Sequence, residues 1–551
     1  MKRRIHPAII GLALALWALL GPGLPAARAQ GAALPPVSAS APAPTSASAS
    51  AAEPLVVREW HLPELESLDA PTLQRLTLPY LRKPFGAAQA QQLRDSLLAE
   101  LAERGLTLAG VALRVIDAPR GIVALQVIEP RLRRIELTAA VDAPLADAQV
   151  QRLLASHGVR EASLLDLRRL DAAMFALNDL PGLRAQASLA PSGDEAQFDL
   201  VIERGWRARA EGSVDADNHG SRYNGRWRIG TLLRWNEPLQ LGDNLDLRLQ
   251  LAQHGGLASA RAAYELPLGR IGDSAWRTSL AASTLSYELG DVYAPLQARG
   301  RAGVLDLGFS RSLLRSRERN LVLRLGTSHK RLQDRFDAFG LRTDKSTRDL
   351  SLALSFESRD GWGGGGYTGG VFTLQAGRLT IRSPGARAED AALGDRAAQG
   401  GFRKLGLQLS RLQALGGPWS VFGGVSGLWA DRNLDPSEKF ALGGASAVRG
   451  YPPGEAAADR AALATLELRH AFGQQWSAFV LAERGWARLQ ARPQPGVDNR
   501  RMLGARGLGV FFSDPAWFTL RGSVAWQGTE RSVSEPDDDG PRLNLQLQRG
   551  F

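Results

Sequence analysis

The residues with the most distinctive chemistry lie in one long connection in the C-terminal part of the chain. Residues 432–460 separate two amphipathic segments and contain the run Leu442-Gly-Gly-Ala-Ser-Ala-Val-Arg-Gly-Tyr451, followed by two prolines. Glycines and prolines give such a segment a tight path, and its tip presents one cation, Arg449, beside one aromatic ring. The chemistry available to this pair is ion pairing and packing. A connection this long is usually functional or disordered, so two interpretations stand: a loop folded back into a pore, or an ordinary surface turn.

Catalytic and metal-binding constellations are missing from the sequence. The seven histidines are scattered without a pair at metal-ligand spacing, and there is neither a GxSxG elbow nor a GxxxxGK[ST] phosphate loop. The absence of cysteine excludes a thiolate site. Carboxylates such as Asp246 and Glu467 stand among arginines and are interpreted as wall charges rather than as an acid–base pair. We therefore predict a protein that is not an enzyme and that has no catalytic residue, metal or cofactor.

The segments on both sides of the loop alternate apolar and polar residues at strand spacing. Over residues 206–551 amphipathic strand candidates follow one another with Gly, Asp and Asn turns between them, and we count about 16. An even number of strands with apolar faces toward lipid predicts a transmembrane β-barrel of antiparallel strands. In the last strand Leu543, Leu545, Leu547 and Phe551 share one face. A soluble sandwich can also end on such a strand, so the barrel prediction depends on the whole series.

The N-terminal residues predict export. Residues 1–29 combine a basic start, a short apolar run and the small-x-small sequence Ala27-Arg28-Ala29, as in a secretory signal peptide. Residues 30–53 are almost entirely Ala, Ser, Pro and Gly and are predicted to be a flexible linker. The net charge of +11 could suggest nucleic acid as a partner. Export argues against that partner, and arginines at strand spacing favour a cationic lumen instead.

Two copies of one α+β unit stand between the linker and the strands. Each copy has a strand, two helical segments and a hairpin, and the copies cover residues 54–129 and 130–205. At about 75 residues, each is just long enough to form a core of its own. The chain is therefore predicted to carry two small domains in front of the barrel.

With the repeats and the loop in view, the chain resembles a known superfamily. Val448-Arg449-Gly450-Tyr451 resembles the hallmark loop motif of proteins that join periplasmic POTRA domains to a sixteen-stranded barrel. Two repeats, rather than three or five, resemble its two-partner secretion branch, the TpsB transporters, which include the haemolysin and adhesin secretion proteins. The stretches 177–183 and 217–220 resemble further parts of that branch. The resemblance covers residues 54–551 and implies an outer-membrane β-barrel of a Gram-negative bacterium, preceded by two periplasmic α+β POTRA-like domains.

The resemblance also implies a partner for the loop arginine. In the family this arginine reaches an acidic residue on the inner wall of the strand after next, in a phenylalanine-x-aspartate-x-glycine-like motif. In the matching segment Glu483 occupies the acidic position and Gly485 the glycine, while Leu481 replaces the aromatic residue. A fork between arginine and carboxylate can fix a loop inside a partly hydrated lumen. Another lumen carboxylate, or water, remains an alternative partner of Arg449.

The function implied by the resemblance is secretion of a large partner exoprotein of the TpsA type in unfolded form. The POTRA-like domains would capture the client, and the loop 432–460 would gate the pore. The last strand would pair with the first to close the barrel and would be the signal that barrel-assembly machinery reads. Outer-membrane lipid and lipopolysaccharide are further expected partners. The rivals are a barrel-assembly insertase of the same superfamily, for which two repeats are too few, a passive diffusion porin, which needs no periplasmic domains, and an outer-membrane hydrolase, which needs a serine–histidine pair.

Overall fold

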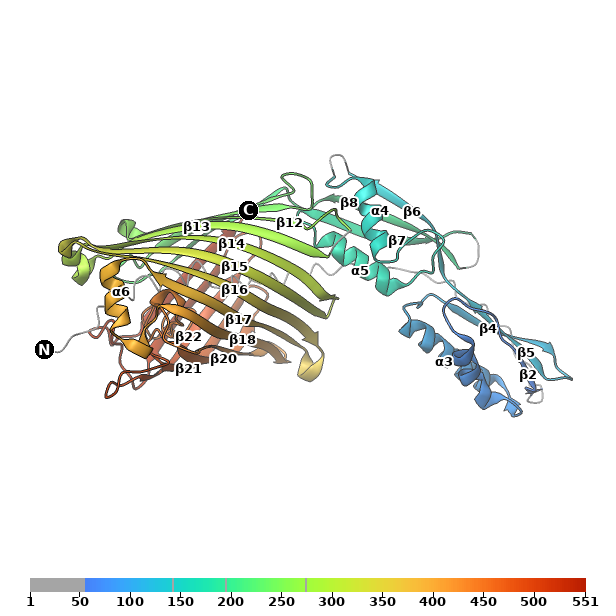
Figure 1. Ribbon diagram of the computed structural model, residues 1–551. Helices are drawn as coiled ribbons and strands as arrows, with labels where there is room; N and C mark the ends of the chain where they lie inside the picture. Colours follow the sequence, from blue (N-terminus) through green and yellow to red (C-terminus); the bar gives the residue numbers. More distant parts are fainter. Residues whose placement is uncertain (1–54, 141–142, 194–195, 273–274) are drawn as a thin grey trace.

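The computed structural model describes residues 55–140, 143–193, 196–272 and 275–551. The predicted signal peptide (1–29) and linker (30–53) lie outside these residues. Within them, no helix has the length and apolar character needed to cross a membrane. Two small α+β units lie one after the other at one end of a large barrel, and the short helix α6 (Pro384–Ala391) lies at the other end (Figure 1).

The first small unit is a three-stranded sheet covered by helices. The sheet order is β2-β5-β4, with β2 parallel and β4 antiparallel to β5. On α3, Leu93, Leu97 and Leu101 recur every fourth residue, so they share one face and are buried in the core. The elements are β1 (Leu55–Val56), β2 (Glu59–His61), α2 (Ala70–Thr77), β3 (Pro84–Phe85), α3 (Ala87–Glu103), β4 (Gly110–Asp117) and β5 (Ile122–Ile128).

The second unit repeats this arrangement. Its sheet order is β6-β8-β7, with β6 parallel and β7 antiparallel to β8. The core lies between this sheet and two helices, whose buried residues include Leu154, Leu170 and Met174. The elements are β6 (Arg131–Ala139), α4 (Asp147–Ser156), α5 (Leu167–Asn178), β7 (Leu183–Pro191) and β8 (Gln197–Trp206).

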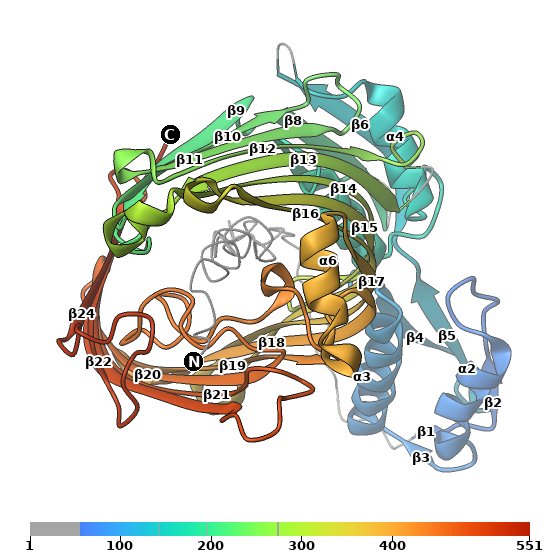
Figure 2. The same cartoon turned by 60° about the vertical axis from the view of Figure 1, so that its left-hand side comes forward.

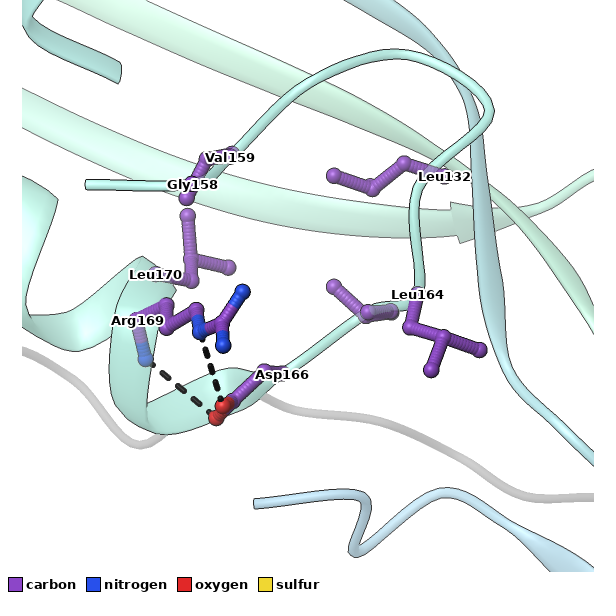
Figure 3. Close-up of a pocket in the computed structure, with 8 residues that line it drawn as sticks. Leu132, Gly158, Val159, Leu164, Asp166, Arg169 and Leu170 are labelled. Atoms are coloured by element: carbon purple, nitrogen blue, oxygen red, sulfur yellow. Dashed lines mark hydrogen bonds and ion pairs between the residues drawn. The ribbon is translucent and has the colours of Figure 1, made fainter. Parts of the chain in front are cut away.

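The two small units meet where α3 ends and α5 begins. Asp166 caps α5, because its side chain accepts the N–H groups of Arg168 and Arg169. Figure 3 shows this cap beside a small recess lined mainly by leucines, with Arg169 bending back to Asp166. The N–H of Leu167 donates to the carbonyl of Gly105 at 2.9 Å, which ties the start of α5 to the end of the first unit. The recess is therefore a packing feature of this joint, remote from the barrel lumen.

The second unit is fastened to the barrel by charge and by packing. Arg315, at the end of β14, donates to both carboxylate oxygens of Asp179 at 2.6 and 2.5 Å. Arg317, two residues later in the turn after β14, pairs with Asp171 of α5 at 3.1 Å. Ile271, in the turn after β12, is buried in the core of the second unit. These contacts place the second unit at the ends of the strands on this side of the barrel (Figure 1).

The barrel is closed and, over the described residues, has sixteen antiparallel strands, as the sequence pattern predicted. Each strand pairs with its neighbours in chain order, and the last pairs with the first. The strands are β9 (Ala210–Asp217), β10 (Arg228–Asn236), β11 (Asn244–Ala252), β12 (Leu257–Pro267), β13 (Trp276–Glu288), β14 (Ala298–Arg315), β15 (Arg319–Phe336), β16 (Leu341–Asp360), β17 (Gly366–Ile381), β18 (Gly400–Gly416), β19 (Trp419–Ala430), β20 (Arg460–Phe472), β21 (Trp476–Arg488), β22 (Arg500–Ser513), β23 (Thr519–Gln527) and β24 (Arg542–Gly550).

The seam between β24 and β9 combines a short ladder with a side-chain clamp. Five residue pairs, from Gln546↔Asp217 to Gly550↔Ser213, form the ladder, and Phe551 exchanges both backbone bonds with Gly212 at 2.9 Å. Beyond the ladder, the Asn218 side chain accepts from the N–H of Leu545 and donates to the carbonyl of Leu543, both at 2.8 Å. The asparagine thus extends the pairing where the two backbones separate, which leaves no free strand edge at this point.

The two faces of the wall differ as period-two alternation requires. Leu543 and Leu547 of the last strand are exposed on the outer face, and Phe551 is exposed beyond it. Between the two leucines, Asn544 is buried on the inner face. Apolar side chains turned outward and polar side chains turned inward are the pattern of a barrel that lies in lipid.

Candidate functional site

The long connection between β19 and β20 folds back into the barrel. In Figure 2 this orange segment lies inside the ring of strands. Its two arms are joined by a bridge between Phe440 and Ala458, with reciprocal backbone bonds at 2.9 and 2.8 Å. Leu442, Val448 and Tyr451 are fully buried against inward residues of β20, β21 and β22. The segment is therefore a packed occupant of the lumen rather than a surface turn.

Arg449 lies at the tip of this loop and is bound to the wall at Glu483 of β21. Its backbone N–H donates to Oε2 of Glu483, and its Nε donates to Oε1, each at 2.7 Å. Its guanidinium carbon also lies 5.7 Å from the ring centre of Phe479, which precedes Glu483 by four residues on the same face of β21. Arg449 is only 4% exposed. The structure thus brings together the two residues that the family resemblance paired.

Glu467, on the neighbouring strand β20, is a second carboxylate at the same point. Its Oε1 accepts from Nη2 of Arg449 at 2.6 Å and from Arg521 of β23 at 3.1 Å, while Oε2 accepts from Arg469 at 2.6 Å. Glu467 is 1% exposed, so three guanidinium groups share one buried carboxylate. Sequence reasoning treated Glu467 as a wall charge and did not link it to Arg449. The available signal was that Glu467 and Glu483 both face inward on adjacent strands.

Glycines make the room that this contact needs. A Cβ on Gly485 would lie 2.9 Å from Cδ2 of Leu442 and 3.2 Å from Cγ2 of Val448. A Cβ on Gly450 would lie 3.0 Å from the backbone carbonyl of Trp526, on β23. The loop tip is therefore packed against the wall at two glycines, where a larger side chain would force its neighbours to move. On its other side, the carbonyl of Arg449 accepts from the side chain of Asn544, on the last strand, at 3.2 Å.

The first arm of the loop is held by lysines on a different part of the wall. Glu438 accepts from Lys330 of β15 at 2.7 Å and from Lys404 of β18 at 2.5 Å. Asp435 accepts from Lys345 of β16 at 2.8 Å. Burial alone would raise the pKa of Glu438, but the two lysines hold it at about 2, so the carboxylate is ionised at neutral pH. We call these three lysines, Lys330, Lys345 and Lys404, the lysine clamp. It was not predicted from the sequence.

Comparison with known proteins agrees with this geometry. Residues 197–508, more than half of the chain, match the protein family described as "Haemolysin secretion/activation protein ShlB/FhaC/HecB". The chain belongs to this haemolysin secretion/activation family. The predicted membership in the TpsB transporters is thereby confirmed, and the barrel lies in the outer membrane with the small units in the periplasm.

Relatives within the family differ considerably in sequence. The heme/hemopexin transporter protein HuxB of Haemophilus influenzae is 26% identical over 357 residues, which are 63% of this chain and 62% of that protein. The outer membrane transporter CdiB of Dickeya dadantii is 23% identical over 84% of this chain and 81% of its own. The solved structure of CdiB from Escherichia coli has a TM-score of 0.74 at 18% identity, with full coverage of both chains, and so shares the fold.

Proposed function

We propose that this protein is a pore that exports a large partner exoprotein of the TpsA type across the outer membrane, in unfolded form. The observation that carries the proposal is the position of the loop 432–460. A packed loop inside the lumen must move before a polypeptide can pass, and its tip is held by ion pairs and not by covalent bonds. Family membership supports the same function.

The loop would act as the gate, with Arg449, Glu483 and Glu467 as its latch. Taking these charges out of water is costly, and the pairs offset that cost only while their geometry holds. Displacement of the tip by a client would separate Arg449 from two carboxylates at once and would rehydrate all three side chains. In the closed state the ion pairs stabilise this latch, and in the open state hydration of the charged side chains offsets the loss of the ion pairs. Val448, Gly450 and Tyr451 would set its position through packing.

The periplasmic units would capture the client by strand addition. In the first unit β4 is an edge strand of its sheet, and its residues Val115 and Ile116 are 51% and 54% exposed. An open strand edge with apolar side chains beside it suits an extended, unfolded segment. The second unit, fastened to the barrel through Arg315, would pass the segment toward the lumen. With no nucleotide motif in the chain, we infer that folding of the client outside the cell gives the direction, without a cofactor.

The last strand would serve assembly of the pore itself. Leu543, Leu545, Leu547 and Phe551 form the apolar outer face of β24 and the residue after it, and β24 pairs with β9. We infer that barrel-assembly machinery reads this strand. Phe551 lies over Gly212, where a Cβ would come within 2.3 Å of the ring, so the closing strand has one fixed register.

The test is secretion of a candidate large exoprotein, measured in the medium of cells that express it together with this protein. The wild-type protein should release the exoprotein, and Arg449→Ala should alter release while the barrel still assembles. Arg484→Ala is the matched control, because Arg484 lies on the same strand as Glu483 but is exposed on the outer face. Absence of the exoprotein from the medium with the wild-type protein contradicts the export proposal. Normal release by Arg449→Ala contradicts the gate hypothesis but leaves the export proposal standing.

A further inference from the structure

Strands β14 to β18 each contribute one exposed outer-face arginine to a set of five. Alternation puts them on the same side as the exposed leucines of the wall, and all five are exposed. We call this set the arginine collar: Arg301, Arg331, Arg348, Arg378 and Arg403.

Strand register places the collar at one height on the barrel. The cross-strand pairs are Arg301↔Gln333, Arg331↔Ser346, Arg348↔Arg378 and Arg378↔Gly401. Where an arginine does not face the next one directly, the next one lies two residues away from the facing position, in each case toward the periplasmic end. Because barrel strands are tilted, a level line must step along successive strands in one direction. The five arginines therefore follow the barrel circumference.

The collar lies at the extracellular edge of the apolar belt. Arg315, at the far end of β14 from Arg301, contacts the periplasmic unit, so the collar end of the strands points away from the periplasm. Immediately toward the periplasm, the outer face carries exposed leucines, among them Leu305, Leu350 and Leu405. Guanidinium groups at this edge can extend to the headgroup region while their stems cover apolar surface.

The collar differs from Arg411 and Arg311, at the periplasmic edge of the wall, which have a carboxylate and an aromatic partner respectively. Among the described residues, none of the five collar arginines forms an ion pair with a carboxylate. At the periplasmic edge, Arg411 of β18 pairs with Asp360 at 2.8 Å, and Arg311 of β14 lies over the ring of Trp276. Arg348 and Arg378 face each other directly, with His329 opposite Arg348 on its other side. Like charges placed opposite one another destabilise a sheet unless an anion bridges them.

We propose that the arginine collar binds the phosphate groups of a phosphorylated glycolipid, lipopolysaccharide, in the extracellular leaflet. A guanidinium group donates two parallel hydrogen bonds to a phosphate, which suits a row of such groups at headgroup height. The acyl chains of the same lipid would contact the leucines below the collar. One bridging phosphate between Arg348 and Arg378 would remove the repulsion between them. The site goes beyond export, since it lies on the opposite face of the wall from the gate.

The test compares lipid retained by the full-length chain purified from outer membranes in mild detergent and then exposed to lipid A in mixed micelles. The collar variant Arg348→Gln/Arg378→Gln/Arg403→Gln should retain on the order of tenfold less bisphosphorylated lipid A, because each basic side chain near an anionic surface adds to binding. The control is Arg311→Gln, an exposed outer-face arginine on β14 at the periplasmic edge, which should retain as much as wild type. Heat-dependent gel mobility verifies that each barrel is folded.

A second arm keeps the proposal testable if the triple variant does not assemble. Wild-type protein is given lipid A whose phosphates have been removed, with the acyl chains unchanged. Much weaker retention of this lipid supports phosphate recognition. Equal retention of the two lipids, or equal retention by wild type and the collar variant, overturns the proposal and assigns the lipid contact to the leucines alone. Competition by free inorganic phosphate at millimolar concentration would show that the site takes phosphate without the lipid, which also contradicts it.

Discussion

Arg449 is joined to Glu483 by two hydrogen bonds of different origin, one from its backbone N–H and one from its Nε, each 2.7 Å long. The backbone bond fixes the position of the residue, and the side-chain bond fixes the orientation of its guanidinium group. A third bond, from Nη2 to Glu467, makes the guanidinium span two neighbouring strands. The loop tip is therefore held by geometry as well as by attraction.

Arg449→Lys should separate these two contributions. Lysine keeps the charge and the backbone bond, but a single ammonium cannot occupy the Nε and Nη2 positions together. We expect the lysine variant to open the pore more often than wild type and less often than Arg449→Ala, as measured by single-channel conductance in planar bilayers. Arg484→Lys, on the outer face, is the control and should conduct like wild type. Equal conductance of wild type and Arg449→Lys would show that charge alone holds the tip.

Glu467→Gln should destabilise the folded barrel more than Glu483→Gln does. Removing the Glu467 charge leaves Arg449, Arg469 and Arg521 close together without their shared carboxylate. Loss of one partner of a buried ion pair typically costs about 3–5 kcal/mol. We expect a lower temperature for the loss of heat-dependent gel mobility, partly restored by Arg521→Gln in the same chain. If Glu467→Gln melts like wild type, the three arginines must be neutralised by other groups.

Glu483 and Glu467 also mark what sequence reasoning can reach at this site. Glu483 followed from a motif position in one strand, which needs no knowledge of pairing. The contact with Glu467 depends on register, since Glu483 faces Thr465 and Glu467 lies two residues further along β20. A one-residue change of register would turn Glu467 to the outer face. The partner of an ion pair between strands is therefore fixed by long-range pairing that the local sequence does not encode.

Gly485→Val should displace the loop without changing any charge. The new side chain would collide with Leu442 and Val448, both packed in the lumen. We expect raised conductance and a loss of barrel stability of about 1–3 kcal/mol, as for overpacked cores. Leu442→Ala in the same chain should restore part of both. Gly423→Val is the control, because a Cβ on Gly423, in strand β19, meets nothing within 4 Å. Unchanged conductance of Gly485→Val would show that the loop yields without opening.

The lysine clamp should hold the first arm of the loop independently of Arg449. In Lys330→Gln/Lys404→Gln, Glu438 would be a buried carboxylate without its two cations. We expect a broader distance distribution between spin labels at Ser446→Cys, in the loop, and Gln474→Cys, in the turn after β20. The chain has no native cysteine, so labelling is specific. Lys439→Gln, whose partner is Asp459 at the end of the loop, serves as comparison. An unchanged distance distribution would show that the lysine clamp does not hold the loop and that only the contacts of Arg449 at the tip do.

The strands of the barrel and its closure by the last strand were more predictable than the side-chain contacts at the seam and in the lumen. Alternation over each strand reveals the number of strands, because every strand in lipid must present an apolar face. The Asn218 clamp at the seam and the lysine clamp join residues hundreds of positions or several strands apart, so no local pattern predicts them. The division of residues 55–61 into two short strands, β1 and β2, has a similar reason. Val57 turns into the core, and the N–H groups of Arg58 and Glu59 both bond to the carbonyl of Gly121.

A buried carboxyl in a periplasmic turn should make barrel stability depend on pH. Glu237, between β10 and β11, accepts from the N–H of Gly242 through Oε2 at 2.8 Å, while Oε1 has no hydrogen-bond partner among the described residues. Burial, reinforced by the neighbouring Asp243, raises the pKa of Glu237 to about 7. The folded barrel therefore binds this proton more tightly than the unfolded chain does. Its stabilising effect is complete below the ordinary pKa and is lost as pH rises toward 7.

Glu237→Gln should remove this dependence, because glutamine keeps an oxygen for the Gly242 bond and carries no charge. At pH 8 we expect the variant to be more stable than wild type by about 1–2 kcal/mol, a fraction of what a shift of this size allows. At pH 4.5 the difference should be small, since the wild-type carboxyl is then protonated. The measurement is the melting midpoint by gel mobility at both pH values. Glu318→Gln, an exposed carboxyl in the turn after β14, is the control. A variant that is less stable than wild type at pH 8 would mean that the ionised Glu237 makes a favourable contact, contrary to its burial.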